Sequence, residues 1–275
     1  MSARAPADMV RQAIVNGRPI AYRRAGAGDA LVLLHGFIVD SRSWRPQLEA
    51  LSDTFTVIAW DAPGTGRTAD PDVLSEFADW ADTLAGLLDS LDLRKAHIVG
   101  LSWGGILAQE LYRRHRTRVS SLVLADTYAG WKGSLPEPVV EARLAACLRD
   151  AALPADEFVA RYLPSMFSPS APAEIRAEMA RIMADFHPGG FRLMAGALAR
   201  ADTRDLLPTI EVPTLLVWGE ADARSPMGIA YQLRDAIPGS ELVVIGDAGH
   251  VSNLEQSARF NEAVRAFYAN LSPGS

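Results

Sequence analysis

The chain has 275 residues with 49% hydrophobic and 22% charged side chains, and its formal net charge is −6. This length and composition predict a folded protein with one large core, and the acidic balance without a dense basic stretch argues against a nucleic-acid partner. The one cysteine, Cys147, excludes an intrachain disulfide and fits a reducing compartment.

The sequence gives no sign of membrane insertion or export. Residues 1–10 contain no apolar core of signal-peptide length, and no apolar run approaches the roughly 20 residues that a membrane-spanning helix needs. We therefore expect a soluble, cytoplasmic protein with no membrane partner. Its oligomeric state, monomer or dimer, stays open.

The first predicted element is a β-hairpin. Asn16 and Gly17, a pair typical of a type I′ turn, separate apolar segments at residues 13–15 and 19–22. Six further apolar runs do not alternate with polar residues, which is typical of strands buried on both faces of a parallel sheet. These runs are residues 31–34, 56–60, 97–99, 122–125, 214–218 and 241–245.

Helical patterns lie between most of the apolar runs. The alternation predicts an α/β fold with a mostly parallel, twisted sheet of about eight strands flanked by helices. The helical patterns cover residues 44–51, 77–91, 103–115, 229–236 and 254–268.

One interval, residues 126–207, interrupts this alternation because it contains no convincing strand. Its four helical stretches are residues 139–148, 156–162, 173–186 and 190–199. We expect a helical cap at residues 131–205, inserted between two parts of one core domain, residues 1–130 and 206–275. Most of its aromatic and methionine side chains are expected to form its own core, and some are expected to face a ligand cavity.

The segment Gly100–Gly104, Gly-Leu-Ser-Trp-Gly, is the most informative motif. It follows an apolar strand pattern and precedes a helical one, so Ser102 is predicted at the apex of a sharp strand-to-helix turn. Such a turn strains the serine backbone and exposes its hydroxyl, while side chains at Gly100 and Gly104 would collide across the bend. Ser102 is therefore the candidate nucleophile.

A serine nucleophile needs a base and a carboxylate that orients it. His250 follows the last predicted strand, and Ser252 and Glu255 just beyond it match a capping box that opens the last helix. Asp222 follows the strand at residues 214–218 and is the favoured acid, with Asp126, after the strand at 122–125, as the alternative. The carboxyl ends of parallel strands share one edge of a sheet, so we expect these side chains to converge there.

Other candidates for these roles are weaker. Glu220 is a distant third choice for the acid. His97 is expected at the opposite edge of the sheet and His115 at a helix end, whereas His187 lies in the cap and could contact substrate. Cys147 lies inside a helical pattern with no neighbouring histidine, which disfavours it as a nucleophile.

Several motifs together resemble the α/β-hydrolase superfamily over the whole chain, in a form with a helical cap. They are the elbow at Ser102, His35-Gly36-Phe37, Asp61-x-Pro63-Gly64-x-Gly66, Gly219-x-x-Asp222 and Ala248-Gly249-His250, with nucleophile, acid and base in the superfamily's chain order. Within it, the chain looks most like small bacterial esterases, enol-lactonases and cofactor-free haloperoxidases.

This resemblance implies an oxyanion hole. The backbone N–H of Trp103, next to the nucleophile, supplies one donor, and by resemblance the N–H of Phe37 supplies the other. His35 is expected to hold the loop that carries Phe37. Trp103, Tyr128 and Trp131 are expected as walls of the substrate pocket, because all three adjoin the predicted edge of the sheet.

The predicted activity is hydrolysis of a small hydrophobic carboxylic ester or lactone through an acyl-enzyme on Ser102. Hydrolysis of a carbon–carbon bond and perhydrolysis, as in haloperoxidases, use the same triad, and a ligand-binding receptor on this fold is an alternative of another class. No metal site is expected, since the chain lacks His-Glu-x-x-His and paired cysteines. No cofactor is expected, because the glycine pattern at residues 64–69 does not open a helix directly, as a dinucleotide site requires.

Overall fold

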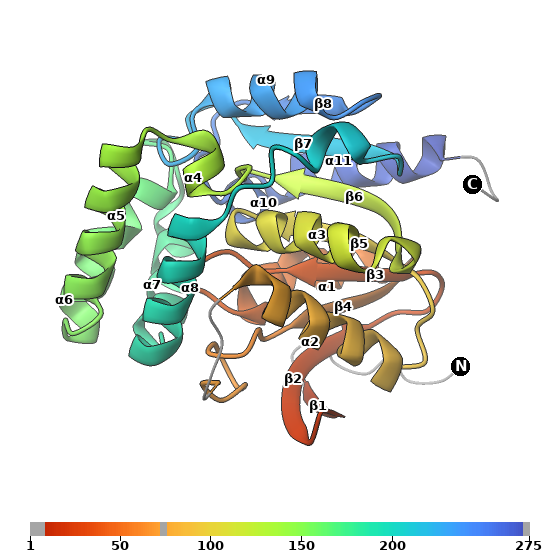
Figure 1. Ribbon diagram of the computed structural model, residues 1–275, viewed down its shortest axis with the longest axis horizontal. Helices are drawn as coiled ribbons and strands as arrows, with labels where there is room; N and C mark the ends of the chain where they lie inside the picture. Colours follow the sequence, from red (N-terminus) through yellow and green to blue (C-terminus); the bar gives the residue numbers. More distant parts are fainter. Residues whose placement is uncertain (1–8, 72–75, 272–275) are drawn as a thin grey trace.

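The computed structural model describes residues 9–71 and 76–271, and its centre is a single eight-stranded sheet (Figure 1). The strand order is β1-β2-β4-β3-β5-β6-β7-β8, in which β1 and β2 pair antiparallel, β2 and β4 pair antiparallel, and all other pairs are parallel. The predicted α/β class and the mostly parallel sheet of eight strands are confirmed. The strands are β1 (Val10–Val15), β2 (Arg18–Ala25), β3 (Ala30–Leu34), β4 (Thr56–Trp60), β5 (Ala96–Leu101), β6 (Val119–Ala125), β7 (Thr214–Gly219) and β8 (Glu241–Ile245).

The central strands are buried on both faces because helices cover both sides of the sheet. Every residue of β3, β4 and β7 is buried, as their uninterrupted apolar runs predict. Helices α2 and α3 lie in front of the sheet in the view of Figure 1, and α1 and α11 pack together behind it. The helices of these two layers are α1 (Arg45–Leu51), α2 (Phe77–Ser90), α3 (Trp103–Arg114), α9 (Met227–Ala236), α10 (Ser252–Glu255) and α11 (Ser257–Asn270).

The chain between β6 and β7 forms a layer of helices, which lies at the left of Figure 1, although the two strands are neighbours in the sheet. The described residues between these two strands form no strand, as the sequence predicts. Prolines flank or open most of these helices, which explains why the apolar pattern is broken into short segments. The layer, called the helical layer below, consists of α4 (Trp131–Ser134), α5 (Glu137–Asp150), α6 (Ala155–Tyr162), α7 (Ala173–Ala184) and α8 (Pro188–Arg200).

Two local predictions need correction. The last strand, β8, was expected to be buried on both faces, yet only Ile245 is buried, because β8 pairs with β7 alone and ends the sheet. The last helix was expected to begin at Leu254, but the chain instead forms two helices, α10 and α11, interrupted at Gln256.

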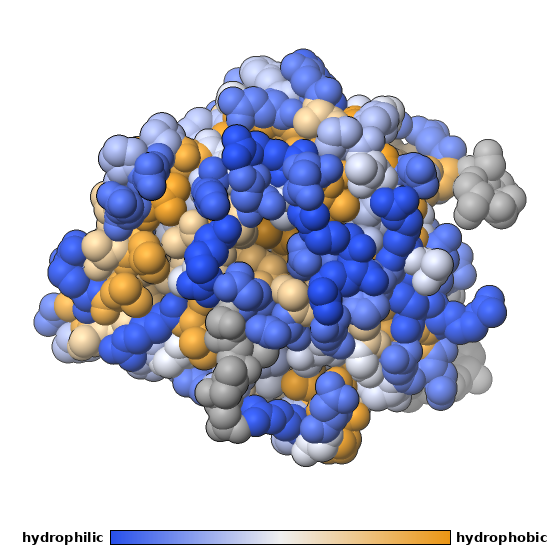
Figure 2. Space-filling model, viewed as in Figure 1, coloured by the Kyte–Doolittle hydropathy of each residue, from blue (hydrophilic) through white to orange (hydrophobic). Residues whose placement is uncertain are grey.

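Hydrophobic side chains are exposed at several places on the surface, the helical layer among them. Figure 2 shows hydrophobic side chains over the helical layer at the left of the view, and Val139 and Leu148 of α5 are among the exposed large hydrophobic residues. None of the helices in the described ranges is long and apolar enough to span a membrane. The ends of the two predicted core segments, residues 1–8 and 272–275, lie outside the described residues.

Candidate active site

Ser102 occupies the turn between β5 and α3 in a backbone conformation that residues other than glycine rarely adopt. Its φ is 53° and its ψ is −112°, outside both helical and extended geometry. A positive φ at a non-glycine residue is held only where the surroundings enforce it. Here the backbone N–H of Ser102 donates to the carbonyl oxygen of Ala125 at 2.8 Å, which fixes the turn against the end of β6.

The two glycines of the elbow prevent different collisions. A methyl group on Gly100 would overlap the carbonyl of Gly104, so this position confirms the expected clash across the bend. A methyl group on Gly104 would instead overlap the carbonyl oxygens of Leu34 and His35, at the end of β3. The second glycine therefore lets the first turn of α3 approach a neighbouring strand.

Ser102, His250 and Asp222 form one continuous hydrogen-bonded chain. His250 Nε2 lies 2.8 Å from Ser102 Oγ, and His250 Nδ1 lies 2.8 Å from Asp222 Oδ2. All three residues are buried. The structure thus brings together three side chains that are far apart in the sequence. Asp222 lies 120 positions after Ser102, and His250 lies 28 positions after Asp222.

The Asp222 loop determines which nitrogen of His250 carries the proton. Asp222 Oδ1 accepts the backbone N–H groups of Arg224 and Ser225 at 2.8 and 2.9 Å, which turns Oδ2 toward the imidazole. Since a carboxylate only accepts hydrogen bonds, the proton of neutral His250 is on Nδ1. Nε2 is then free to accept the hydroxyl proton of Ser102.

Asp126, the alternative acid, lies at the same sheet edge but makes other contacts. Its Oδ1 accepts the backbone N–H of Gly219 at 2.7 Å and its Oδ2 accepts the hydroxyl of Ser252 at 2.6 Å. Burial, followed by the negative charge of Asp222, raises the pKa of Asp126 well above its ordinary value. Asp126 therefore joins the ends of β6 and β7 to α10, and it forms no hydrogen bond with His250 among the described residues.

Glu255 supports the His250 loop, a role that the sequence did not reveal. The predicted capping box is wrong, because the Ser252 hydroxyl donates to Asp126 and does not cap a helix. Glu255 Oε2 accepts the N–H of Gly249 at 2.8 Å, and its carboxyl also accepts the N–H and hydroxyl of Ser168. One buried carboxyl thus ties the residue before His250 to the chain that follows α6.

His35 orients the peptide group that precedes Phe37. Its Nδ1 donates to the carbonyl oxygen of Gly36 at 2.8 Å, and its Nε2 accepts the N–H of Ala62 at 3.1 Å. Burial lowers the pKa of His35, which favours this neutral form. Because C=O and N–H point in opposite directions across a trans peptide, the N–H of Phe37 is directed away from the His35 ring.

The N–H of Trp103 is the second amide predicted at the site. Trp103 is the first residue of α3, and an N–H at this position has no acceptor within its own helix. The amide is therefore available beside the Ser102 hydroxyl. The helix N-terminus also carries partial positive charge, which favours an oxygen anion at this position.

The indole of Trp103 is not in the position expected of a pocket wall. It is fully buried and packs against Trp80, Phe77 and His35, with ring centroids 5.4, 5.1 and 6.2 Å away. The side chain leaves the first turn of α3 toward α2, while the backbone of the same residue faces Ser102. Trp103 is accordingly absent from the lining of the cavity beside Ser102.

A narrow cavity of about 20 Å³ adjoins Ser102 and His250 beneath the helical layer. Tyr128 and Trp131 line it, in agreement with their expected position. Arg143 of α5 and Arg224 of the Asp222 loop also line it, and the sequence analysis missed both. Its hydrophobic side chains are Phe37, Val39, Leu101, Tyr128, Trp131, Met166, Met179, Leu198 and Val251.

Two other histidines make contacts away from this cavity. His187, which was expected to reach substrate, lies 2.7 Å from Asp70 through Nδ1 and 3.2 Å from the carbonyl oxygen of Gly66 through Nε2. It joins the start of α8 to the loop after β4 and is absent from the cavity lining. His115, at the end of α3, lies with its Nε2 2.7 Å from the carboxylate of Asp82 in α2.

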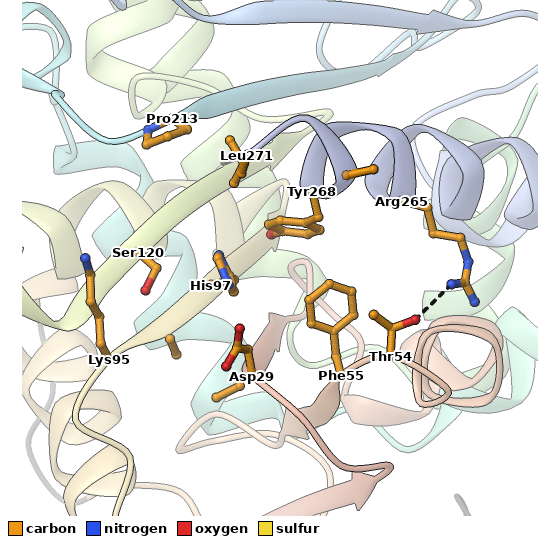
Figure 3. Close-up of a pocket in the computed structure, with 13 residues that line it drawn as sticks. Asp29, Thr54, Phe55, Lys95, His97, Ser120, Pro213, Arg265, Tyr268 and Leu271 are labelled. Atoms are coloured by element: carbon orange, nitrogen blue, oxygen red, sulfur yellow. Dashed lines mark hydrogen bonds between the residues drawn. The ribbon is translucent and has the colours of Figure 1, made fainter. Parts of the chain in front are cut away.

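A second cavity, of about 650 Å³, lies at the opposite edge of the sheet, where β3 and β5 begin (Figure 3). His97, Phe55 and Tyr268 pack together there, with centroids 4.7 Å apart for His97 and Tyr268 and 5.1 Å for Phe55 and Tyr268. His97 Nδ1 lies 2.8 Å from the hydroxyl of Ser121, which is fully buried on β6. This serine lies inside β6, not on a turn, and its complete burial closes it to a substrate.

Within residues 9–71 and 76–271, no group of three or more His, Cys, Asp or Glu side chains is arranged to hold a metal ion.

Comparison with known proteins gives consistent results. A model of the alpha/beta hydrolase family matches residues 31–263. The pimeloyl-[acyl-carrier protein] methyl ester esterase of Vibrio cholerae is 30% identical over 254 residues, which cover 90% of this chain and 96% of that protein.

Solved structures of an esterase and of an enol-lactonase are similar to this chain over almost its whole length. A thermophilic esterase from Thermogutta terrifontis, with malate bound, is 30% identical with a TM-score of 0.88, covering 96% of this chain and 100% of that one. The enol-lactonase of Burkholderia xenovorans is 27% identical with a TM-score of 0.84, covering 94% of this chain and 100% of that one.

Proposed function

The chain belongs to the alpha/beta hydrolase family, and on that premise we propose that it is a serine hydrolase of carboxylic esters or lactones. One observation carries the proposal: two hydrogen bonds of 2.8 Å join Asp222 to His250 and His250 to Ser102. The likeness to esterases and to an enol-lactonase supports the reaction class.

His250 acts as the general base in the first step. Its Nε2 removes the proton from Ser102 Oγ as the oxygen attacks the carbonyl carbon of the ester. Asp222 holds the imidazole in the tautomer that accepts at Nε2 and stabilises the imidazolium that forms. His250 then gives the proton to the departing alkoxide, which leaves as an alcohol and leaves the acyl group on Ser102.

Two backbone amides stabilise the oxyanion of the tetrahedral intermediate. The N–H groups of Trp103 and Phe37 are assigned to this role, and each is worth roughly 3 kcal/mol by analogy with removal of one such donor. His35 serves as a positioning residue, since it fixes the peptide between Gly36 and Phe37. In the second half-reaction His250 activates water, which attacks the acyl-enzyme and releases the carboxylic acid.

The helical layer acts in this proposal as a cap that closes the site, with domain limits at residues 131–205. Trp131, Met166 and Met179 of this cap, together with Tyr128 just before it, surround the cavity beside Ser102 and exclude water from the reacting bond. The narrow, mainly apolar lining favours a small substrate with a hydrophobic acyl or ring portion.

Activity-based labelling tests this function. The wild-type protein is incubated with a fluorophosphonate, and the adduct is located by peptide mapping, with Ser102→Ala as the matched control. We expect a single adduct on Ser102, loss of essentially all hydrolysis of short-chain esters by the Ser102→Ala variant, and unchanged circular dichroism. Substantial ester hydrolysis by the folded variant contradicts the assignment.

Product analysis separates this reaction from others that use the same residues. A panel of esters, lactones, diketones and peracid-forming conditions is assayed with the wild-type protein and with Ser102→Ala. Acid and alcohol as the products support ester hydrolysis. Carbon–carbon cleavage or peracid formation as the faster reaction would reassign the chemistry while retaining Ser102, and tight binding without turnover indicates a receptor.

A further inference from the structure

We propose that the substrate carries a free carboxylate, which Arg143 and Arg224 bind beside the reacting ester. This inference rests on the proposed hydrolase function and identifies its substrate class. Both arginines line the cavity that also contains Ser102 and His250. Arg143 comes from α5 of the helical layer and Arg224 from the loop of Asp222, so the site is formed where the two parts of the molecule meet.

The two guanidinium groups use only some of their N–H donors in hydrogen bonds within the protein. Arg143 donates to the hydroxyl of Tyr128 at 3.2 Å and to the backbone carbonyl of Arg224 at 3.3 Å, while the side chain of Arg224 donates to Ser165 Oγ at 2.9 Å. Each guanidinium has five N–H groups, so most are left for a ligand. Within the described part of the chain, neither arginine forms an ion pair with a carboxylate.

Two carboxylates on the same two elements, Asp222 and Asp150, are already engaged. Asp222 accepts hydrogen bonds from His250 and from two backbone amides. Asp150 accepts the hydroxyl of Tyr162 at 3.0 Å and pairs with Arg161 at 3.3 Å. Neither carboxylate is ion-paired with Arg143 or Arg224, so the guanidinium donors at the cavity are available to an anion.

Aromatic rings hold both guanidinium groups in place. The Arg143 Cζ lies 5.6 Å from the ring centroid of Trp131 and 6.0 Å from that of Tyr128, and the Arg224 Cζ lies 6.0 Å from that of Tyr162. Stacking of this kind restricts a long side chain before a ligand arrives, which reduces the entropy lost on binding. Tyr128 also donates a hydrogen bond to the carbonyl of Arg224, which fixes the loop that presents it.

The position of the pair predicts a short distance between carboxylate and ester. Arg224 follows Asp222 by two residues, and the backbone N–H of Arg224 donates a hydrogen bond to the Asp222 carboxylate. The anion is therefore bound close to the catalytic side chains. Half-esters of short dicarboxylic acids and lactones with a carboxylate substituent fit this arrangement, whereas a neutral ester leaves the guanidinium donors without an anion.

Two substrates that differ in the carboxylate test the inference. Monoethyl glutarate carries the carboxylate, and ethyl pentanoate replaces it with a methyl group. We expect the wild-type protein to have the higher kcat/KM for monoethyl glutarate. Arg143→Gln and Arg224→Gln should each lower the ratio of the two kcat/KM values by roughly 10- to 100-fold, the usual value of a hydrogen bond to a charged group. Arg149→Gln, on the exposed side of the same helix, should leave both values unchanged.

A binding measurement distinguishes failure of the inference from failure of the function. Glutarate and its dimethyl ester are titrated calorimetrically into Ser102→Ala and into the same variant with Arg143→Gln. Binding of glutarate but not of its dimethyl ester, with loss of that binding in the Arg143→Gln variant, supports the carboxylate site. If the wild-type protein then hydrolyses no ester, only the hydrolase function is contradicted. The inference is overturned if the arginine variants hydrolyse esters with an unchanged ratio of the two kcat/KM values, or if glutarate does not bind. Neither result contradicts the hydrolase function.

Discussion

Asp126 and Asp222 follow the neighbouring strands β6 and β7, and only Asp222 is hydrogen-bonded to His250. Burial raises the pKa of Asp126, and the charge of Asp222 raises it further. Two buried carboxylates at one edge of a sheet repel each other when both are ionised, so one of them retains its proton more readily. The arrangement gives the two residues different roles: Asp222 orients the imidazole, and Asp126 connects backbone and hydroxyl groups.

We predict that Asp222→Asn lowers kcat far more than Asp126→Asn. An amide at position 222 cannot hold His250 in the tautomer that accepts at Nε2, so kcat should fall by about 10⁴, as for the equivalent change in serine proteases. Asp126→Asn should leave kcat within roughly tenfold of the wild-type value, because no contact joins Asp126 to His250. Steady-state kinetics on a short-chain ester measures both, and greater damage from Asp126→Asn would mean that the acid was misassigned.

A pH dependence of stability is predicted from Asp126. Between the ordinary carboxyl pKa of 3.8 and the raised pKa in the folded protein, the folded state holds a proton that the unfolded chain has released. Stability from this group therefore falls as pH rises through that window, by about 1.4 kcal/mol for each pH unit within it. Asp126→Asn removes the effect and keeps the shape of the side chain.

Urea denaturation at pH 5, 6, 7 and 8 measures this prediction. The free energy of unfolding of Asp126→Asn minus that of the wild type should increase toward higher pH. Subtraction of the two curves cancels the titration of the groups that do not interact with Asp126. Parallel curves across this range would show that Asp126 does not titrate in it.

Gly100→Ala is predicted to destabilise the protein and to reduce activity. The added methyl group overlaps the backbone of Gly104, which has no flexible atoms that could move aside, so the elbow must shift. Overpacking of this kind costs roughly 1–3 kcal/mol and displaces Ser102. The matched control is Gly228→Ala in α9, where a methyl group meets no atom within 4 Å. It should stabilise the helix by up to about 1 kcal/mol. Equal effects of the two substitutions on thermal unfolding would contradict the packing argument.

The main features of the fold and the positions of Ser102, Asp222 and His250 could be predicted because they depend on local patterns. An uninterrupted apolar run indicates a strand of a parallel sheet, and a polar residue after such a strand is at the carboxyl edge whatever its neighbours are. The catalytic roles of these residues stay predictions until they are measured, but their convergence follows from topology.

Other features depend on contacts that no local pattern encodes. Arg143 is one of several arginines on helices, and only the packing of α5 against the Asp222 loop brings it beside Arg224. The side chain of Trp103 was expected in the pocket because its backbone is there, yet its indole fills the space between α2 and α3. The capping-box pattern failed at Glu255 for a related reason. A partner 87 residues away, Ser168, competes successfully for the same carboxyl.

This last contact leads to a prediction about Glu255, which we expect to position His250 without touching the substrate. Glu255→Gln replaces an acceptor oxygen by an amide N–H₂ group, which must then face the donating N–H of Gly249 or of Ser168. A buried donor without an acceptor costs roughly 1–3 kcal/mol. We expect the free energy of unfolding to fall by that amount and kcat to fall by about 10- to 100-fold, with little change in KM.

Two further variants separate a positioning role from general destabilisation. Ser168→Ala removes the hydroxyl bond on the side of the helical layer and leaves the bond from Glu255 to Gly249, so kcat should fall less than in Glu255→Gln even where stability falls equally. Glu262→Gln, exposed on α11, should change neither quantity. If Glu255→Gln lowers stability while kcat stays at the wild-type value, then the His250 loop keeps its geometry without this carboxylate and Glu255 has only a structural role.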